Sequence, residues 1–516
     1  MPSRFFSLLL RTYALLSLGA CIVWPIRAQT ITPEIRAERA FRKASSNPLE
    51  LRAFLVGMPK GGDLHFHLTG AVYAETILGD AAEDDLCVNL ISHRLEPNKS
   101  VSASGTPRVT CATGSVPAVE LPSDQKAYDA MVDAWSMRSF VPSNGISGHD
   151  HFFSSFLRAG TSRRHLGEWL DEVATRAASQ NEQYLEVQVA TPSENALRAA
   201  DQVSWSSDMA QVRAALLEHH LRDDVAAGRA DLDKMEETRN AREHCRTAEP
   251  ASACHVLVRF LFVVGRANSP ARVFAQALLA FELASADDRV VGINFAQPED
   301  GFLAMSEYHR QMQMLDYLHS IYPEVHLSLH AGELAPGMVP PEGLRFHIRE
   351  AVETAHAERI GHGVDVMYED NPQQLLKELA QKHIMVEINL TSNDVILDVA
   401  RKDHPLPLYV AAHVPVALST DDEGVSRIDL THEYVRAVTD FGWSYQDLKR
   451  SARTSIAHSF LPGADLWAAP DNFTRVVPPC SRPTSEECSA LLKSSLKAQQ
   501  EWELEKRFAA FEARQP

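Results

Sequence analysis

Positive charge is scarce in this sequence: 50 lysines and arginines stand against 68 aspartates and glutamates, giving a formal net charge of −18. The chain also has no compact run of basic residues. A nucleic-acid-binding surface needs a basic stripe that displaces counterions, so this composition argues against a nucleic-acid partner. Hydrophobic residues make up 45% of the 516 positions, an ordinary share for a globular protein that can bury a large core.

Several motifs are absent as well. No glycine-rich GxGxxG turn follows a candidate strand, which disfavours an open, doubly wound sheet. No two cysteines have the CxxC spacing of a cysteine zinc site, and "PPCSRPTSEEC" does not fit the P-C-x-x-C signature of cytidine-type deaminases. No internal repeat or low-complexity linker divides the chain. Length alone therefore allows one large domain with appendages or two to three smaller ones.

Long apolar runs are rare, and the most uniform one lies near the N-terminus. Arg4 and Arg11 precede the apolar run "TYALLSLGACIVW", which is too short to span a bilayer comfortably. The small residue Ala28 follows this run. We expect residues 1–28 to be a cleaved signal peptide, which predicts an extracytoplasmic (periplasmic or secreted) protein. "LGAC" resembles a lipoprotein cleavage box that would anchor the protein to a membrane through Cys21. The apolar run continues past that cysteine, which favours simple cleavage.

Export would place the remaining six cysteines in an oxidising compartment, where an even number suggests disulfides. Six cysteines allow 15 connectivities, which leaves the pairing open. Pairing of neighbours would close only short loops, in segments typical of insertions or tails. The neighbours are Cys87 and Cys111, Cys245 and Cys254, and Cys480 and Cys488.

From Leu64 onward, short β-branched runs alternate with longer amphipathic stretches such as "SPARVFAQALLAFELAS" and "NPQQLLKELAQKH". Eight strand–helix units on one chain predict an α/β fold, a (β/α)8 TIM barrel. The candidate strands are residues 63–68, 183–190, 255–264, 290–296, 325–331, 359–364, 384–390 and 414–420.

We expect four further divisions of the chain around this alternation. Residues 29–57 are helical in pattern, broken at Asn47-Pro48, and form an N-terminal extension. The barrel spans 58–463 and carries a polar, loop-like insertion at 80–126. Residues 464–516 form a C-terminal extension that ends in a charged helical run.

The strands of such a barrel end at one mouth, and catalytic residues sit there. A lone histidine at a strand end is more often a surface residue, and an adjacent acid pair is more often a helix cap. The combination of strand ends points to a site. They carry His65, His67, His330, Glu333, His362, Asp421 and Asp422.

Four of these residues form a ligand set for one Zn²⁺. His65 and His67 lie two apart on a strand, so both imidazoles project to the same side. With His330 and Asp421 they offer three imidazoles and one carboxylate, which suits zinc with water completing its shell. A bound divalent metal lowers the pKa of its water from about 15.7 toward 7.

The other three residues supply proton chemistry. His362 could accept the water proton or hold the hydroxide in line, and Asp422 could orient the water from the other side. Glu333 remains as an acid or base aimed at the substrate, a role worth about 10²–10⁴-fold in rate. Metal, activated water and a separate proton donor predict a hydrolytic site.

"MPKGGDLHFHLTG", "HAGE", "RIGHG" and "STDDEG", in this order, resemble the adenosine deaminase family, most closely its secreted branch related to adenosine-deaminase growth factors. The resemblance covers roughly residues 58–463 and ends with "SARTSIAHSFL". It implies zinc on the four ligands above. It further implies that Glu333 protonates a purine ring nitrogen while hydroxide, oriented by His362 and Asp422, attacks the carbon that bears the amine. Adenosine would become inosine and ammonia, 2′-deoxyadenosine would become 2′-deoxyinosine and ammonia, and Asp422 would also contact the purine.

The secreted branch carries N-terminal helices used for dimerisation and a disulfide-bearing insertion after the first strand. Residues 29–57 and 80–126 resemble these parts, which implies a homodimer. "DAWSMRSF" and the following "HDHFFSSF" resemble that branch's pocket helix region, where Trp135 is expected to face the ribose.

Two positions depart from the family pattern. Thr69 stands where cytosolic adenosine deaminases have an aspartate that contacts the ribose. Gln297 stands where the family usually has a glycine whose backbone meets the purine. The alternatives are therefore a metal-dependent amidohydrolase that acts on a modified purine or a free base, and a non-catalytic secreted growth-factor-like binding protein. The latter predicts a lost ligand or a lost Glu333, and neither is missing.

Overall fold

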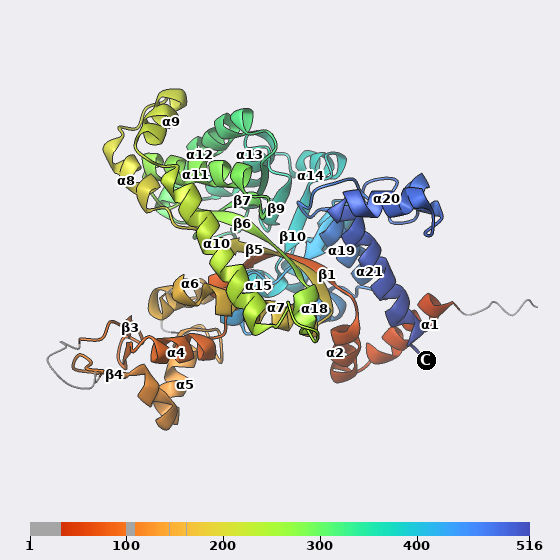
Figure 1. Ribbon diagram of the computed structural model, residues 1–516, viewed down its shortest axis with the longest axis horizontal. Coiled ribbons are helices and arrows are strands. Elements are labelled where there is room, and N and C mark those ends of the chain that lie inside the picture. The colour runs from red at the N-terminus through yellow and green to blue at the C-terminus, as the bar shows by residue number, and fades with distance from the viewer. Residues whose placement is uncertain (1–31, 100–108, 144, 161–162) are drawn as a thin grey trace, which may run out of the picture.

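Eight parallel strands form a barrel in the computed structural model, which describes residues 32–99, 109–143, 145–160 and 163–516 (Figure 1). The strands neighbour one another in chain order, and every neighbouring pair is parallel. They are β1 (Gly61–His67), β5 (Glu182–Val189), β6 (Leu257–Gly265), β7 (Val290–Ala296), β8 (His326–Ala331), β9 (Arg359–His362), β10 (Met385–Ile388) and β11 (Val416–Leu418). All eight predicted strands are confirmed. The predictions for the signal peptide and the lipoprotein box lie outside the described residues.

The barrel closes between its first and last strands. The peptide N–H of His67 donates to the carbonyl oxygen of Asp421, and the N–H of Asp421 donates to the carbonyl oxygen of His65, both at 2.9 Å. These bonds join the end of β1 to the residues that follow β11. They complete the predicted TIM-barrel architecture.

The strands are buried because helices cover the barrel outside and side chains fill it inside. Every residue of β5 and β7 is buried, as expected for parallel strands with two covered faces. Polar side chains inside the barrel pair with one another. The amide of Asn294 donates to the amide oxygen of Gln188 at 2.7 Å.

Helices surround this barrel, and the two amphipathic stretches quoted above form α11 and α14. Helix α19 shows how sequence sets such a helix. Ser444 and Asp447 form a reciprocal cap at its start, and Leu448, Ala452 and Ile456, spaced by four residues, are buried. The helices from β5 onward are α8 (Glu194–Gln202), α9 (Met209–Glu218), α10 (Asp223–Arg242), α11 (Pro270–Ala286), α12 (Phe302–Ile321), α13 (His347–Glu353), α14 (Pro372–Gln381), α15 (Leu390–Leu397), α16 (Leu406–Ala411), α17 (Glu423–Ser426), α18 (Leu430–Phe441) and α19 (Tyr445–Ala457).

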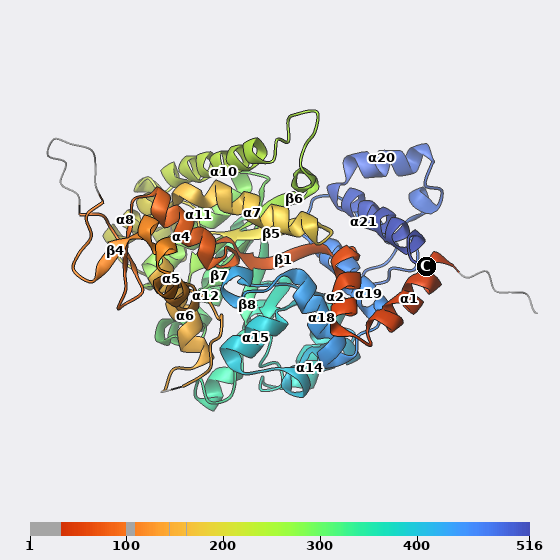
Figure 2. The same cartoon turned by 90° about the horizontal axis from the view of Figure 1, so that it is seen from below.

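The two terminal extensions pack against each other beside the barrel (Figures 1 and 2). Phe54 meets Phe511 with ring centroids 5.1 Å apart, and Phe41 meets Phe54 at 5.8 Å. These aromatic contacts bury apolar surface from both ends of the described chain against α19. The helices concerned are α1 (Pro33–Ala44), α2 (Pro48–Gly57), α20 (Glu486–Ser494) and α21 (Leu496–Ala513).

Most of the segment between β1 and β5, with α4, α5, α6 and β4, lies on the opposite side of the barrel from these extensions, whereas α7 packs along β5 (Figures 1 and 2). The prediction of a loop-like insertion at 80–126 is wrong in part, because three short strands form an antiparallel sheet in the order β3-β2-β4. Strands of two or three residues are too short to show a periodic pattern. The elements are α3 (Leu68–Ala71), α4 (Ala74–Glu83), β2 (Cys87–Asn89), β3 (Leu95–Glu96), β4 (Ser115–Pro117), α5 (Gln125–Ala134), α6 (Gly148–Ala159) and α7 (Leu166–Ser179).

Three disulfides join neighbouring cysteines: Cys87–Cys111, Cys245–Cys254 and Cys480–Cys488. Pairing of neighbours is thus the connectivity that the structure adopts. Within the described part of the chain, no helix combines the length and the apolar character needed to cross a bilayer.

Candidate metal centre and active site

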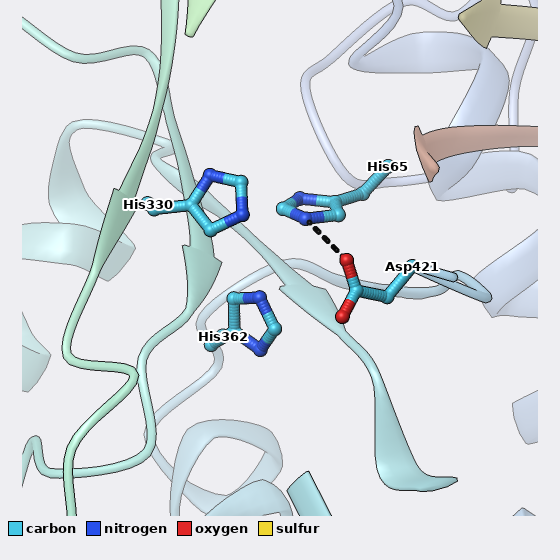
Figure 3. Close-up of side chains that lie close together, drawn as sticks. All are labelled: His65, His330, His362 and Asp421. Atoms are coloured by element: carbon cyan, nitrogen blue, oxygen red, sulfur yellow. Dashed lines mark ion pairs between the residues drawn. The ribbon is translucent and has the colours of Figure 1, made fainter. Parts of the chain in front are cut away.

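Side chains from four strand ends converge at the mouth of the barrel. The ligand atoms of His65, His330, His362 and Asp421 all lie within 4.8 Å of one another, and Figure 3 shows their side chains gathered around one point. His67 adjoins this group, with its Nε2 3.3 Å from Nε2 of His330 and 3.5 Å from Oδ1 of Asp421. The structure therefore brings together all four predicted zinc ligands, and His362 belongs to the same group of ligand atoms as His65, His330 and Asp421.

His65 provides a test of whether a metal fits here. Its Nδ1 lies 2.5 Å from the carboxylate of Glu387, which is also held by Ser328 Oγ and Arg359 Nε at 2.7 Å each. The ring therefore donates through Nδ1. Its Nε2 is buried, makes no hydrogen bond among the described residues, and lies 3.4 Å from Oδ1 of Asp421, the pair dashed in Figure 3. Leaving such an atom unpaired costs about 1–3 kcal/mol, which a bound cation would remove. The donor set is that of a divalent metal such as zinc.

The other donors are oriented by side chains behind them. Nδ1 of His330 lies 2.9 Å from Oδ1 of Asn294, and Nδ1 of His362 lies 2.9 Å from Oδ1 of Asn393. An amide oxygen only accepts, so each Nδ1 carries the hydrogen and each Nε2 offers a lone pair. Such outer contacts fix the ring orientation of metal-binding histidines.

Asp421 and Asp422 occupy a tight turn after β11. Asp421 has a left-handed backbone with φ +60°, and its Oδ2 accepts from Ser392 Oγ at 2.6 Å. Oδ1 of Asp422 is buried and has no partner among the described residues. A Cβ at Gly70 would lie 1.6 Å from that oxygen, so glycine is required there for Asp422 to reach the mouth.

Glu333 lies at the same mouth, with Oε1 3.7 Å from Nε2 of His362. Burial raises the pKa of Glu333 well above its ordinary value, and the negative charges of Asp421 and Glu299 act in the same direction. Both effects favour the protonated form of this carboxyl group. The pKa of Asp422 is raised by burial and by the neighbouring Asp421 charge.

A cavity of about 340 Å³ opens above these groups, within the size range of small-molecule sites. Its ionisable lining residues are His67, His330, Glu333, Asp421 and Asp422. Its apolar lining comes mainly from α6 and α15. It consists of Phe152, Phe153, Phe156, Leu157 and Ile396.

Two of the three predicted substrate-binding residues, Thr69 and Gln297, line this cavity. Gln297 has φ +90°, a left-handed backbone that favours glycine, and its side-chain oxygen accepts the N–H of Ala267 at 2.8 Å. Trp135 is not among the described residues that line the cavity. It ends α5, its side chain is buried, and its indole N–H donates to the carbonyl oxygen of His93 in the insertion at 2.7 Å.

Sequence reasoning missed the outer residues Glu387, Asn294, Asn393 and Ser392. Glu387 had a signal, because it is a single acid inside the apolar strand "IMVEINL". No sequence signal marked Asn294, Asn393 or Ser392, since the residues that each of them contacts are distant in sequence.

Comparison with known proteins agrees with this geometry. The profile of the family described as adenosine deaminase matches residues 163–466, more than half of the chain. The chain belongs to the adenosine deaminase family. Adenosine deaminase of Escherichia coli (strain SMS-3-5 / SECEC) is 31% identical over 185 residues, which cover 35% of this chain and 50% of that protein. The Salmonella typhi enzyme is 37% identical over 144 residues, 28% of this chain and 40% of that protein. The chain thus spans half or less of the length of these curated relatives.

Solved structures share the fold across most of the chain. An Arabidopsis N6-mAMP deaminase has a TM-score of 0.51 at 20% identity, covering 88% of this chain and 99% of that one. An amidohydrolase from Burkholderia ambifaria with bound Zn has a TM-score of 0.52 at 16% identity, covering 89% and 95%. At these identities the likeness establishes the fold and no more.

Proposed function

We propose that this protein is a zinc-dependent deaminase that converts adenosine to inosine and ammonia, and 2′-deoxyadenosine to 2′-deoxyinosine and ammonia. One observation carries the proposal. A buried cluster of histidines and an aspartate lies beside a second aspartate and a glutamic acid, Glu333, whose pKa is raised by burial, at one end of a cavity. This arrangement supports hydrolysis at a carbon next to a basic ring nitrogen.

His65, His67, His330 and Asp421 would hold one zinc ion per chain. When bound, the metal supplies acidified water at neutral pH. His362 is assigned to the water instead of the metal. Its Nδ1 hydrogen is donated to Asn393, so its Nε2, which lies 3.5 Å from the amide nitrogen of Asn389, carries the lone pair that can accept a proton from the attacking water.

The chain's own groups move the remaining protons. Glu333 gives its proton to N1 of the purine while the water oxygen bonds to C6. Asp422 accepts a hydrogen bond through its unpartnered Oδ1, which fixes the substrate and the attacking water. The C6–N bond then breaks, the amine leaves as ammonia with a proton returned from the site, and the ring keeps the oxygen as inosine.

Thr69 and Gln297 favour a second candidate, a modified purine or a free base, because both replace family residues on the substrate side. The Arabidopsis structure, named as an N6-mAMP deaminase, makes a 6-alkylamino nucleotide a useful member of the test panel. The experiment measures bound metal and then product release from adenosine, 2′-deoxyadenosine, adenine, AMP and N6-methyl-AMP. Highest kcat/KM with adenosine supports the proposal, and highest kcat/KM with another member identifies the alternative.

A non-catalytic binding protein of the growth-factor-like type is the remaining alternative. All seven predicted metal and proton-transfer residues are present and lie at the mouth of the barrel. Metal-loaded protein that releases no ammonia from any member of the panel would favour that alternative.

We further propose kinship with the secreted branch, export by the N-terminal signal, and a homodimer built on the N-terminal helices. The three disulfides and the disulfide-bearing insertion after β1 support export and the branch. Intact-mass analysis of protein from the extracytoplasmic fraction tests the start near Gln29, and light scattering tests the dimer. A mass that includes residues 1–28, or a lipid on Cys21, would contradict simple cleavage.

A further inference from the structure

A buried carboxylate outside the metal centre holds the backbone of the proton donor. Glu299, in the loop after β7, is 2% exposed. Its carboxylate accepts the N–H of Gly332 at 3.0 Å and the N–H of Glu333 at 2.8 Å. Gly332 has φ +76°, and a left-handed residue turns successive N–H groups toward one anion. A Cβ at Gly332 would lie 2.4 Å from Oδ1 of Asp365, so only glycine fits this turn.

Glu299 is itself held by side chains from other elements. Nδ1 of His347, at the start of α13, hydrogen bonds to Oε1 of Glu299, and the His347 ring stacks on Tyr308 with centroids 3.9 Å apart. Arg266 lies with Nη1 3.8 Å from the same oxygen. Although burial acts to raise it, the pKa of Glu299 is about 2 because His347 and Arg266 stabilise the charged form.

Arg266 extends this anchor to the metal centre. Its Nη2 donates to the carbonyl oxygen of His330 at 2.8 Å and to that of Phe295 at 2.7 Å. One buried network therefore holds the end of β7, the end of β8 and the turn that carries Glu333. Neither Glu299 nor His347 is among the described residues that line the cavity.

We infer that Glu299 is a positioning residue for Glu333, with His347 fixing Glu299 in turn. The inference rests on the proposed function, in which Glu333 must meet a ring nitrogen of the substrate. A displacement of about 1 Å in such a group can cost about 100-fold in rate. Substrate affinity depends on the cavity wall, so loss of Glu299 should act on kcat and leave KM almost unchanged.

The test compares Glu299→Gln with a matched control, Glu501→Gln. Glu501 is also 2% exposed and accepts a backbone N–H, that of Leu466 at 2.6 Å, but it lies on α21 in the C-terminal extension. With adenosine, we expect Glu299→Gln to lower kcat about 10–100-fold, with KM within about three-fold and metal content unchanged. Glu501→Gln should keep kcat within about two-fold, whatever its effect on the melting temperature.

His347→Gln is the second variant, because it leaves the Glu299 carboxylate in place and removes only its anchor. A several-fold loss of kcat at constant KM and metal content supports the inference even if Glu299→Gln does not fold. The inference is overturned if either folded variant keeps wild-type kcat, or if its kcat loss matches its loss of metal. Wild-type protein that releases no ammonia overturns the proposed function and this role with it, whereas an active wild type with an active Glu299→Gln overturns this role alone.

Discussion

Replacement of Glu333 by glutamine separates proton donation from every other feature of the site. The exchange of an oxygen for an amide nitrogen keeps the side chain's size, so its place in the cavity wall is retained. Burial and the charges of Asp421 and Glu299 raise the pKa of the wild-type carboxyl group and so favour its protonated form. Glutamine copies the hydrogen bond of that protonated acid but has no proton to transfer.

The expected size of the effect follows from this contrast. Loss of a positioned general acid costs about 10²–10⁴-fold, and a 10³-fold fall in kcat corresponds to about 4 kcal/mol of transition-state stabilisation. KM should change little, because the uncharged side chain replaces an uncharged acid. Zinc content should stay at one per chain, because the donors of the metal centre are unchanged.

The assay follows ammonia release from adenosine by purified, metal-loaded protein at neutral pH, with metal measured on the same sample. Glu501→Gln serves as the control for a buried carboxyl changed to an amide elsewhere in the chain. Turnover by Glu333→Gln within about ten-fold of wild type would refute the assignment of the proton donor. Loss of zinc together with turnover would instead place Glu333 in the metal centre.

Three further predictions concern the metal and its surroundings. Removal of the metal with a chelator should abolish turnover and lower the melting temperature, and added Zn²⁺ should restore both. The melting temperature should respond because a ligand at about 100 times its Kd stabilises the fold by about 2.7 kcal/mol. Full activity of metal-free protein would contradict a metal centre. Glu387→Gln should weaken zinc binding about 10–100-fold in a chelator competition, because it disturbs the hydrogen bond that orients His65; an unchanged affinity would remove that role. Gly70→Ala should lower kcat about 10–100-fold by displacing Asp422, whereas Gly79→Ala in α4, where nothing lies within 4 Å of an added Cβ, should remain active. Equal kcat for the two alanine variants would show that Asp422 tolerates displacement.

The barrel was predictable because its strands are covered on both faces. Such strands are continuous β-branched runs, and eight of them separated by amphipathic stretches leave few alternative folds. Strand ends then indicate the site, since the fold itself brings them together. His65 and Asp421 are 356 positions apart in the chain but 3.4 Å apart at Nε2 and Oδ1.

Side-chain direction outside the strands was not predictable in this way. Trp135 and Phe152 lie in the same stretch that resembles a pocket helix, yet only Phe152 lines the cavity. The direction of the Trp135 side chain depends on the insertion, because the carbonyl oxygen of His93 accepts a hydrogen bond from the indole N–H. The strands of that insertion are too short to be recognised from the sequence. The hydrogen-bonded pair of Glu299 and His347 was not predicted from the sequence for a related reason. Neither residue ends a strand, and their contact depends on how α13 packs.

Closure of the barrel and assembly of the metal centre depend on the same contacts. At the seam, where β1 meets the residues after β11, the N–H of Asp421 donates to the carbonyl oxygen of His65, and the N–H of His67 donates to the carbonyl oxygen of Asp421. The carboxylate of Asp63 also accepts hydrogen bonds from the N–H and the hydroxyl of Thr420. Three of the four proposed ligands therefore lie in the seam itself. Because side chains alternate along a strand, a shift of one residue at this seam would turn His65 and His67 to the opposite face. The register that closes the ring is thus also the register that makes the ligands converge, which is why the order of motifs along the chain was enough to locate the site once a barrel was inferred.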